Sequence, residues 1–281
     1  MVKKLNRYKV RKILPRRKPD MHKGDAGRIL LLCGSVGYTG AAALAAKGAL
    51  RSGSGLVYLG VPESIYQIEA TKLDEAVVFP LPNKNGMLSE KAIEQIDGYL
   101  PRMDAVLLGP GLGIGAGTEA VVKYVMTKYE GTVVLDADGI SLLSGHKNVL
   151  RDRKGTTILT PHEGEFTRFT GTQITHRQIC AQALAADLGC VVLLKGNKTI
   201  ITDGNDVYVN PTGNPGMAVG GCGDVLSGII ASLVGQGVAP LEAAACGAWL
   251  HGAAGDICAK KLGSYGMLPA DMLLTLPRLM G

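Results

Sequence analysis

The stretch RILLLCGSVGYTGAAALAAKGALRSGSGLVYLG, residues 28–60, decides the fold class because it holds one complete strand–helix–strand pattern. Apolar runs at 28–33 and 55–60 predict strands, and the alanine-rich segment 40–51 between them predicts a helix. Both strand-like runs are apolar throughout instead of alternating, which indicates strands covered on both faces. A unit of this kind is typical of a parallel α/β sheet.

The same alternation continues along the chain. Further strand-like runs occur at 104–109, 132–138, 156–160 and 191–196. Further helix-like segments occur at 89–97, 117–129, 163–169 and 175–188. TIITDG and NDVYVN flank an Asp203-Gly204 turn, which predicts an antiparallel hairpin at one sheet edge. We therefore expect a three-layer, doubly wound, mainly parallel α/β sheet with helices on both faces.

Composition and charge narrow the class of protein. A chain of 281 residues that is 46% hydrophobic can bury a sizeable core. Nine Lys and Arg residues precede Asp20, so the chain beyond them is mildly acidic although the total charge is +6. We expect a basic leader over 1–20, solvated and partly packed, followed by a single domain over 21–281; a nucleic-acid arm is the alternative for the leader.

The composition also bears on location. No apolar run approaches the roughly 18 to 20 residues of a membrane span, and no signal core follows the leader charges. Aromatic residues make up only 5% of the chain, which disfavours a base-stacking surface. The six cysteines are scattered without metal-binding spacing. We expect reduced core thiols in a cytoplasmic protein that binds neither membrane nor nucleic acid.

The segment NPGMAVGGCGDVLSGIIASLVGQG, residues 214–237, is the first candidate site. Gly220, Gly221 and Gly223 allow the turn to aim backbone N–H groups at one point, and the helix that follows carries positive charge at its start. Such an end binds anions such as phosphate. Asp224 stands where turn becomes helix, and the alternative is that it is an ordinary cap.

Two glycine-rich turns follow strands and admit competing interpretations. CGSVGYTGA could be taken for a P-loop, but alanine follows Gly40 where the motif needs lysine. GPGLGIGAGT fits a dinucleotide-binding fingerprint, with Asp136 about twenty residues on. Pro110 and the extra glycines at 115 and 117 count against that dehydrogenase hypothesis.

Two more motifs follow strands directly. In TPHEGEF, His162 is held behind a proline at the mouth of the sheet; we favour a binding histidine over a helix cap. In VVLLKGNKT, Lys195 ends a strand and can meet phosphate oxygens as a point charge, the alternative being a surface lysine.

Together these motifs resemble one family. HKGDAGRILLLCGSVGYTGAAALAAKGALRSGSGLV, GPGLG, TPHEGEF, KGNKT and NPGMAVGGCGDVLSG stand in the order found in the ADP-dependent NAD(P)H-hydrate dehydratases of the ribokinase-like superfamily. The resemblance spans about residues 20 to 280 and leaves the basic leader without a role. The family's separate epimerase domain is missing, so the resemblance implies a stand-alone dehydratase.

The resemblance implies a lyase that dehydrates the S form of hydrated NADH or NADPH. ADP phosphorylates the hydroxyl, AMP leaves, and elimination of phosphate restores the dihydronicotinamide. Asp224 resembles the superfamily's catalytic base and lies between both ligands. Residues matching the nucleotide contacts and the amides at the phosphoryl group are Lys195, Gly196, Asn197, Lys198, Thr199, Gly221, Cys222 and Gly223. Positions that face the hydrated dinucleotide match Ala41, Gly113, His162 and Asp224.

The resemblance further implies Mg²⁺ bridging phosphates, without naming its protein ligands, and a homotetramer. ADP or ATP as co-substrate, and NADH or NADPH hydrate as substrate, stay open. A ribokinase-like kinase for a small molecule or vitamin precursor, which keeps the phosphate on its product, is the main alternative. A dehydrogenase would ignore ADP, and a nucleic-acid protein should bind in a steeply salt-dependent way.

Overall fold

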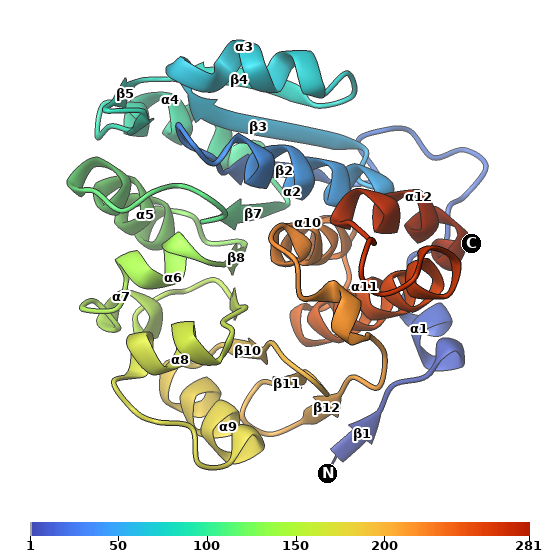
Figure 1. The fold of residues 1–281 in the computed structure, drawn as a ribbon. Helices are drawn as coiled ribbons and strands as arrows, with labels where there is room; N and C mark the ends of the chain where they lie inside the picture. The colour runs from blue at the N-terminus through green and yellow to red at the C-terminus, as the bar shows by residue number, and fades with distance from the viewer. Residues whose placement is uncertain (1) are drawn as a thin grey trace.

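A computed structural model describes residues 2–281 and shows a ten-stranded sheet with helices on both faces (Figure 1). In sheet order the strands are β1 (Val2–Lys4), β12 (Val207–Val209), β11 (Ile200–Thr202), β10 (Val191–Leu194), β9 (Thr157–Leu159), β8 (Thr132–Leu135), β7 (Ala105–Leu108), β2 (Arg28–Leu32), β3 (Leu56–Pro62) and β4 (Val77–Leu81). Every pairing is parallel except the two that β11 makes. The expected doubly wound, mainly parallel sheet is confirmed.

The helices form one layer on each face of the sheet. One face carries α2 (Thr39–Arg51), α3 (Glu63–Lys72), α10 (Cys222–Gly235), α11 (Pro240–Leu262) and α12 (Pro269–Met280). The other carries α4 (Ala92–Tyr99), α5 (Ala116–Lys128), α6 (Asp138–Leu142), α7 (Asn148–Arg151), α8 (Glu163–Thr170) and α9 (Arg177–Leu188). Along β2, Ile29 and Leu31 enter the first core while Leu30 and Leu32 enter the second. Two buried faces explain why the strand runs are apolar throughout.

Short elements complete the chain. They are the hairpin β5 (Asn83–Lys84) with β6 (Met87–Leu88), and the 3₁₀ turns η1 (Leu100–Arg102) and η2 (Pro215–Met217). The expectation of a strand through residue 138 is wrong at its end, because β8 stops at Leu135 and α6 begins at Asp138. Asp136 therefore follows β8 directly at its carboxyl end, where its N–H still donates to Leu108 O of β7 at 3.1 Å.

The chain reverses its direction of travel across the sheet between β2 and β7. From β2 it proceeds to β3 and β4 on one side, and from β7 to β8, β9 and β10 on the other. Open α/β sheets bind ligands beyond the carboxyl ends of the strands at such a switch point. The turns that follow β2 and β7 meet there, with Gly34 N–H donating to Pro110 O at 2.8 Å and Ser35 Oγ to Gly111 O at 2.8 Å.

Helix α10 is held against α2 by two close glycine approaches. A Cβ on Gly228 would lie 2.1 Å from Ala45 O, and one on Gly48 would lie 2.7 Å from Val225 O. Only glycine permits backbones to approach so closely. The packing fixes α10, which carries Asp224 in its first turn, against α2 (Figure 1).

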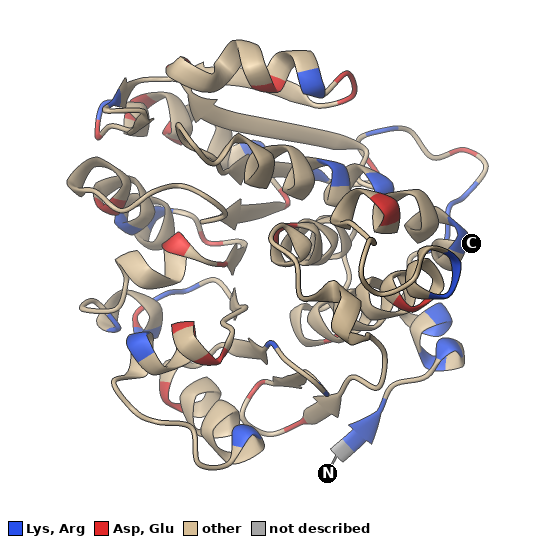
Figure 2. Ribbon diagram, in the orientation of Figure 1, with Lys and Arg blue, Asp and Glu red and all other residues tan. Residues whose placement is uncertain are grey.

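The basic leader joins the domain. β1 pairs in parallel with β12, so the expected hairpin of β11 and β12 lies at this end of the sheet with β1 beyond it. Leu5, together with Val10 on α1 (Arg7–Ile13), is buried in the first core. The lysines and arginines gather on β1, α1 and the loop that follows (Figure 2). Over residues 2–281, no helix is both long enough and apolar enough to cross a bilayer.

Candidate functional site

The start of α10 forms a cradle of backbone amides. Gly221 is the N-cap at φ +97°, a conformation that side chains rarely adopt, and Asp224 is the third helical residue. Cys222 N–H donates to Val219 O at 3.3 Å. Within residues 2–281 the N–H groups of Gly221, Gly223 and Asp224 have no hydrogen-bond partner, which is usual in the first turn of a helix and allows that turn to bind an anion.

Lys195 faces this helix start from the end of β10. Its Nζ lies 2.9 Å from Asp136 Oδ1 and 3.5 Å from Glu165 Oε2. A Cβ on Gly223 would lie 3.6 Å from the same Nζ. The interpretation of Lys195 as a surface lysine is therefore wrong. We call Lys195, Asp136, Glu165 and Asp224 the Lys195 cluster. Its members come from the segments that follow β10, β8 and β9 and from the first turn of α10.

Charges in the Lys195 cluster shift the pKa values of its members. Burial, and then the carboxylate of Asp136, raise the pKa of Asp224 to about 6, while Lys195 opposes the rise. Burial lowers the pKa of Lys195, but Asp136 and Glu165 outweigh that effect and the pKa ends above its ordinary value. Lys195 is therefore a fixed cation, and Asp224 is a carboxyl group that can accept and return a proton near neutral pH.

His162 is the N-cap of α8. Its Nδ1 accepts from the N–H groups of Gly164 at 3.0 Å and Glu165 at 3.2 Å, and Glu165 Oε2 accepts from His162 N–H at 2.8 Å. Because Nδ1 accepts, the proton of the neutral ring stands on Nε2. The cap interpretation holds, and the exposed ring is still free to face a ligand. Substrate binding by His162 stays a prediction.

The glycine turn after β7 is packed, which argues against a dinucleotide-binding fingerprint. Gly113 N–H donates to Asp138 Oδ2 at 2.9 Å, so that amide is already engaged. A Cβ on Gly109 would lie 1.8 Å from Asp136 O, and the Asp136 side chain, which a dehydrogenase would turn to a ribose, binds Lys195 instead.

The turns bring together two predicted substrate positions. A Cβ on Gly111 would lie 2.9 Å from the Cβ of Ala41, so the first turn of α2 sits directly against this loop. Gly113, at φ +79°, follows two residues later. Ala41 and Gly113 thus share the switch point, although no contact in the described part of the chain tests their roles.

The predicted nucleotide loop, residues 195–199, has an unusual backbone. Gly196 has φ +143° and Lys198 has φ +53°. Thr199 Oγ1 donates to Gly196 O at 2.9 Å, which closes the loop on itself. Asn197 and Lys198 are exposed, and no hydrogen bond or ion pair of the described residues joins their side chains to the Lys195 cluster. Only Lys195 of this loop enters the cluster.

Whether the site can bind Mg²⁺ depends on which oxygen-bearing side chains it offers. Across residues 2–281, no three His, Cys, Asp or Glu side chains are placed to hold a metal ion. Mg²⁺ is usually bound through one or two carboxylates, substrate phosphates and water, and needs no protein cage. Asp224 is the partly exposed carboxylate that a phosphate-bound ion could reach here, whereas Asp136 is buried and paired with Lys195, so the residues fit such an ion and not a permanent metal site.

Sequence reasoning missed three groups at the site. Glu165 lies within the TPHEGEF motif, but nothing in that motif indicates its contact with Lys195, and Asp136 entered only as part of the fingerprint. His251 on α11 lies buried behind α10; burial lowers its pKa to about 4, so it is neutral, and its Nε2 has no hydrogen-bond partner in the described structure. A polar residue directly after a strand could have indicated Asp136, whereas nothing in the sequence indicates His251.

Known proteins resemble this chain over most of its length. A family model described as NAD(P)H-hydrate dehydratase matches residues 29–278. The bifunctional NAD(P)H-hydrate repair enzyme Nnr of Moorella thermoacetica is 44% identical over 271 residues, which cover 94% of this chain and 51% of that protein. The enzyme of the same name from Pyrobaculum aerophilum is 37% identical, over 93% of this chain and 52% of its own. The chain spans about half the length of these curated relatives.

Solved structures show the same fold over almost the whole chain. The ADP/ATP-dependent NAD(P)H-hydrate dehydratase of Bacillus subtilis, co-crystallised with ATP and Mg²⁺, has a TM-score of 0.84 at 33% identity, covering 98% of this chain and 96% of that one. A ribokinase-like superfamily protein of Enterococcus faecalis has a TM-score of 0.87 at 28% identity, covering 99% and 95%.

Proposed function

Because the chain belongs to the NAD(P)H-hydrate dehydratase family, we propose that it dehydrates the S form of hydrated NADH or NADPH at the expense of ADP. The observation that carries the proposal is Asp224, a carboxyl group with a raised pKa at a helix start near the cation of Lys195. The N–H groups of Gly221, Gly223 and Asp224 at that start have no partner among the described residues. Acid, amides and cation are the three parts that a phosphoryl transfer from ADP to a hydroxyl needs.

Asp224 acts as the base in the first step. Its carboxylate accepts the proton of the ring hydroxyl as that oxygen bonds to the terminal phosphorus of ADP, and the bond from this phosphorus to the bridging oxygen breaks to release AMP. A pKa of about 6 suits this role, because the group is ionised at neutral pH and still basic enough to hold the proton.

The amides and Lys195 stabilise the transferred group. The negative charge of the phosphoryl oxygens is stabilised by the positive end of α10. The N–H groups of Gly221 and Gly223, which flank Cys222, add to this stabilisation. Lys195 adds a point charge that Asp136 and Glu165 keep in place. Phosphate then leaves the ring carbon as the neighbouring carbon loses a proton, and the dihydronicotinamide double bond returns.

Ligand positions follow the two sides of Asp224. Lys195, Gly196, Asn197, Lys198 and Thr199 form the nucleotide side of the proposal. Ala41, Gly113 and His162 form the side of the hydrated dinucleotide. The place of Ala41 and Gly113 at the switch point of the sheet supports this, and His162 lies after β9 at the start of α8. Mg²⁺ supplies charge neutralisation on the phosphates when it is bound.

The proposal extends to assembly and location. Four exposed apolar side chains at the end of α11 and around α12 support a homo-oligomer, proposed as a tetramer: Leu262, Tyr265, Leu268 and Leu274. Six unpaired cysteines, five of them buried, support a reducing cytoplasmic location. Light scattering of the purified protein tests the tetramer.

The test of function is direct. The protein is incubated with hydrated NADH, Mg²⁺ and either ADP or ATP, while the absorbance of the dihydronicotinamide is followed. A gain in absorbance that requires the nucleotide supports the proposal, and the faster nucleotide identifies the co-substrate. No gain with either nucleotide excludes the dehydratase, and a stable phosphorylated product would favour the kinase alternative.

A further inference from the structure

Arg177, the first residue of α9, binds the backbone of the nucleotide loop from beneath. Its Nη2 donates to Leu194 O at 3.1 Å and to Lys195 O at 2.9 Å, and its Nη1 donates to Asn197 O. One guanidinium therefore bonds three carbonyl groups of the stretch 194–197, at the end of β10 and the start of the loop. Such forked donation is specific to arginine, because lysine presents a single point of charge.

The loop is built around this side chain. A Cβ on Gly196 would lie 2.6 Å from Arg177 Nη2, so the glycine at φ +143° is what admits the guanidinium. The three carbonyl oxygens all accept from one guanidinium and carry partial negative charge. Arg177 satisfies those oxygens and adds a positive charge beneath the loop.

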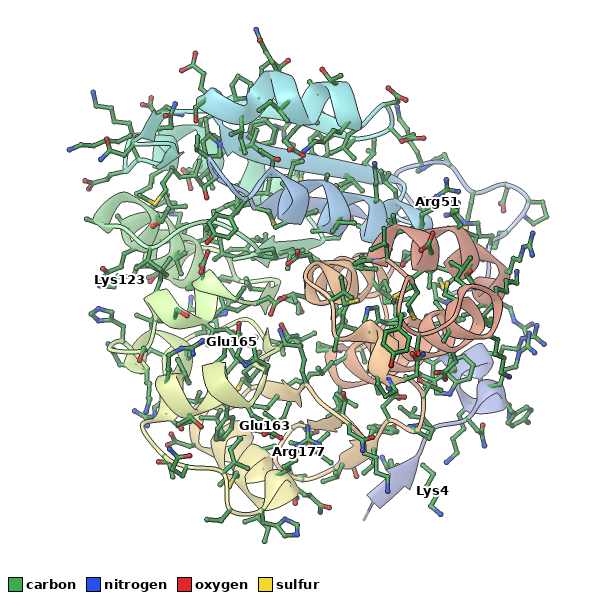
Figure 3. All side chains as sticks on the ribbon, in the orientation of Figure 1. Lys4, Arg51, Lys123, Glu163, Glu165 and Arg177 are labelled. Atoms are coloured by element: carbon green, nitrogen blue, oxygen red, sulfur yellow. The ribbon has the colours of Figure 1, made fainter. Side chains whose placement is uncertain are left out.

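Arg177 also reaches the histidine turn. Its Nε lies 3.0 Å from Glu163 Oε1, close enough for an ion pair although not aligned for a hydrogen bond. Figure 3 shows the two side chains together where α8 and α9 meet. Glu163 follows His162 directly, so one side chain connects the turn proposed for the substrate with the loop proposed for the nucleotide.

We propose that Arg177 is a positioning residue for the nucleotide: by bonding the carbonyl groups of Leu194, Lys195 and Asn197 it ties the loop to the end of β10 and holds residues 195–199 in the conformation that binds the phosphates of a nucleoside diphosphate. This inference rests on the proposed function only in that the loop binds ADP. Arg177 acts through the loop backbone, so its loss affects nucleotide binding and leaves the chemical step intact.

The test compares Arg177→Lys and Arg177→Ala with Arg151→Ala. Arg151 is a matched control because it also bridges to α9, through an ion pair with Asp187 at 2.8 Å, but on the surface. ADP affinity is measured by calorimetry, and KM for each substrate, kcat and the melting temperature are measured on the same preparations. The split between KM and kcat separates positioning from a merely structural role.

We expect Arg177→Lys to weaken ADP binding by about 10- to 100-fold, the worth of charge-assisted hydrogen bonds. KM for the hydrated dinucleotide and kcat at saturating ADP should change by less than about threefold. Arg151→Ala should bind ADP like the wild type. Arg177→Lys that melts normally and binds ADP with unchanged affinity overturns the inference, as does a lowered kcat with an unchanged KM for ADP.

If both Arg177 variants fail to fold, Gly196→Ala disturbs the same contact from the loop side. It should weaken ADP binding in the same range, and unchanged affinity in that variant contradicts the inference. A wild-type protein that does not bind ADP contradicts the proposed function instead, so the two failures are distinct.

Discussion

Nζ of Lys195 lies 2.9 Å from Oδ1 of Asp136, although the two residues are 59 positions apart in the chain. Asp136 is 1% exposed, so its charge is removed from water and compensated by Lys195. The pair lies between the strand ends and α10. Asp136 raises the pKa of Asp224 and Lys195 lowers it, because their charges are opposite. The acid–base behaviour of Asp224 therefore depends on the charges of both residues.

The pH dependence of turnover should report this coupling. With the pKa of Asp224 at about 6, turnover falls as pH drops below that value, because the protonated acid cannot accept the hydroxyl proton. In Asp136→Asn a neighbouring negative charge is lost, so the pKa of Asp224 decreases and the acidic limb moves to lower pH. Profiles of turnover against pH for the wild type and the variant measure the shift.

Asp206→Asn is the control for that experiment. Asp206 pairs with Lys3 at 2.6 Å at the far end of the sheet, so its loss should leave the acidic limb in place. A limb that moves to higher pH in Asp136→Asn would show that Asp224 is not the group being titrated.

Asp224 should also lower the stability of the folded protein at neutral pH. Its folded-state pKa of about 6 exceeds its ordinary value of 3.8, so folding favours the neutral carboxyl group. The contribution of this group to stability is therefore fully present below pH 3.8 and is lost as the pH rises through 6. Ionising the buried group costs up to about 3 kcal/mol. Asp224→Asn should therefore raise the free energy of unfolding near neutral pH by about 1 to 3 kcal/mol.

Urea unfolding at two pH values measures this effect. The gain of Asp224→Asn should shrink as pH falls through 6 toward the ordinary pKa, because the wild-type acid is then neutral as well. A variant that is less stable than the wild type at neutral pH would contradict the burial cost assigned to Asp224.

Gly221 should be intolerant of a side chain. At φ +97°, Gly221→Ala is strained, and its Cβ would lie 2.5 Å from Leu44 Cδ1. We expect a loss of about 1 to 3 kcal/mol in unfolding free energy, and lower turnover because the amides of the helix start move. Gly220→Ala, whose Cβ meets nothing within 4 Å, should lose less than about 0.5 kcal/mol. Equal losses in the two variants would show that the conformation of Gly221 does not matter.

The leader should contribute to the core. Leu5 is 3% exposed, so Leu5→Ala should cost about 2 to 5 kcal/mol in unfolding free energy. Tyr8→Ala is the control, because Tyr8 is 66% exposed and its loss should change stability little. Thermal melting of both variants decides whether the basic leader is a packed part of the fold or a loosely attached arm.

The central strands could be predicted because burial on both faces leaves a direct mark on the sequence. The runs at β2, β3, β7, β8, β9 and β10 are apolar throughout, and each was expected close to its observed position. The edge strands leave no such mark. β1 carries Lys3 and Lys4, and β4 contains Pro80, which an edge strand tolerates because the missing N–H interrupts no central ladder.

The site could be predicted only where a short local sequence pattern indicates it. The glycine turn before Asp224 and the lysine after β10 are local patterns, so both were found. The Lys195 cluster depends on strand register, which brings Leu135 opposite Leu159 and so sets Asp136 near the start of α8. Arg177 and His251 act from helices that meet the site only in the folded chain, so no local pattern indicates them.

The most direct test of the account is Asp224→Asn, measured for ADP affinity and for conversion of hydrated NADH. We expect ADP to bind within about threefold of the wild type, since the amide cradle and Lys195 remain, while turnover falls by about 10² to 10⁴, the usual worth of a positioned base. Turnover near that of the wild type would contradict the account.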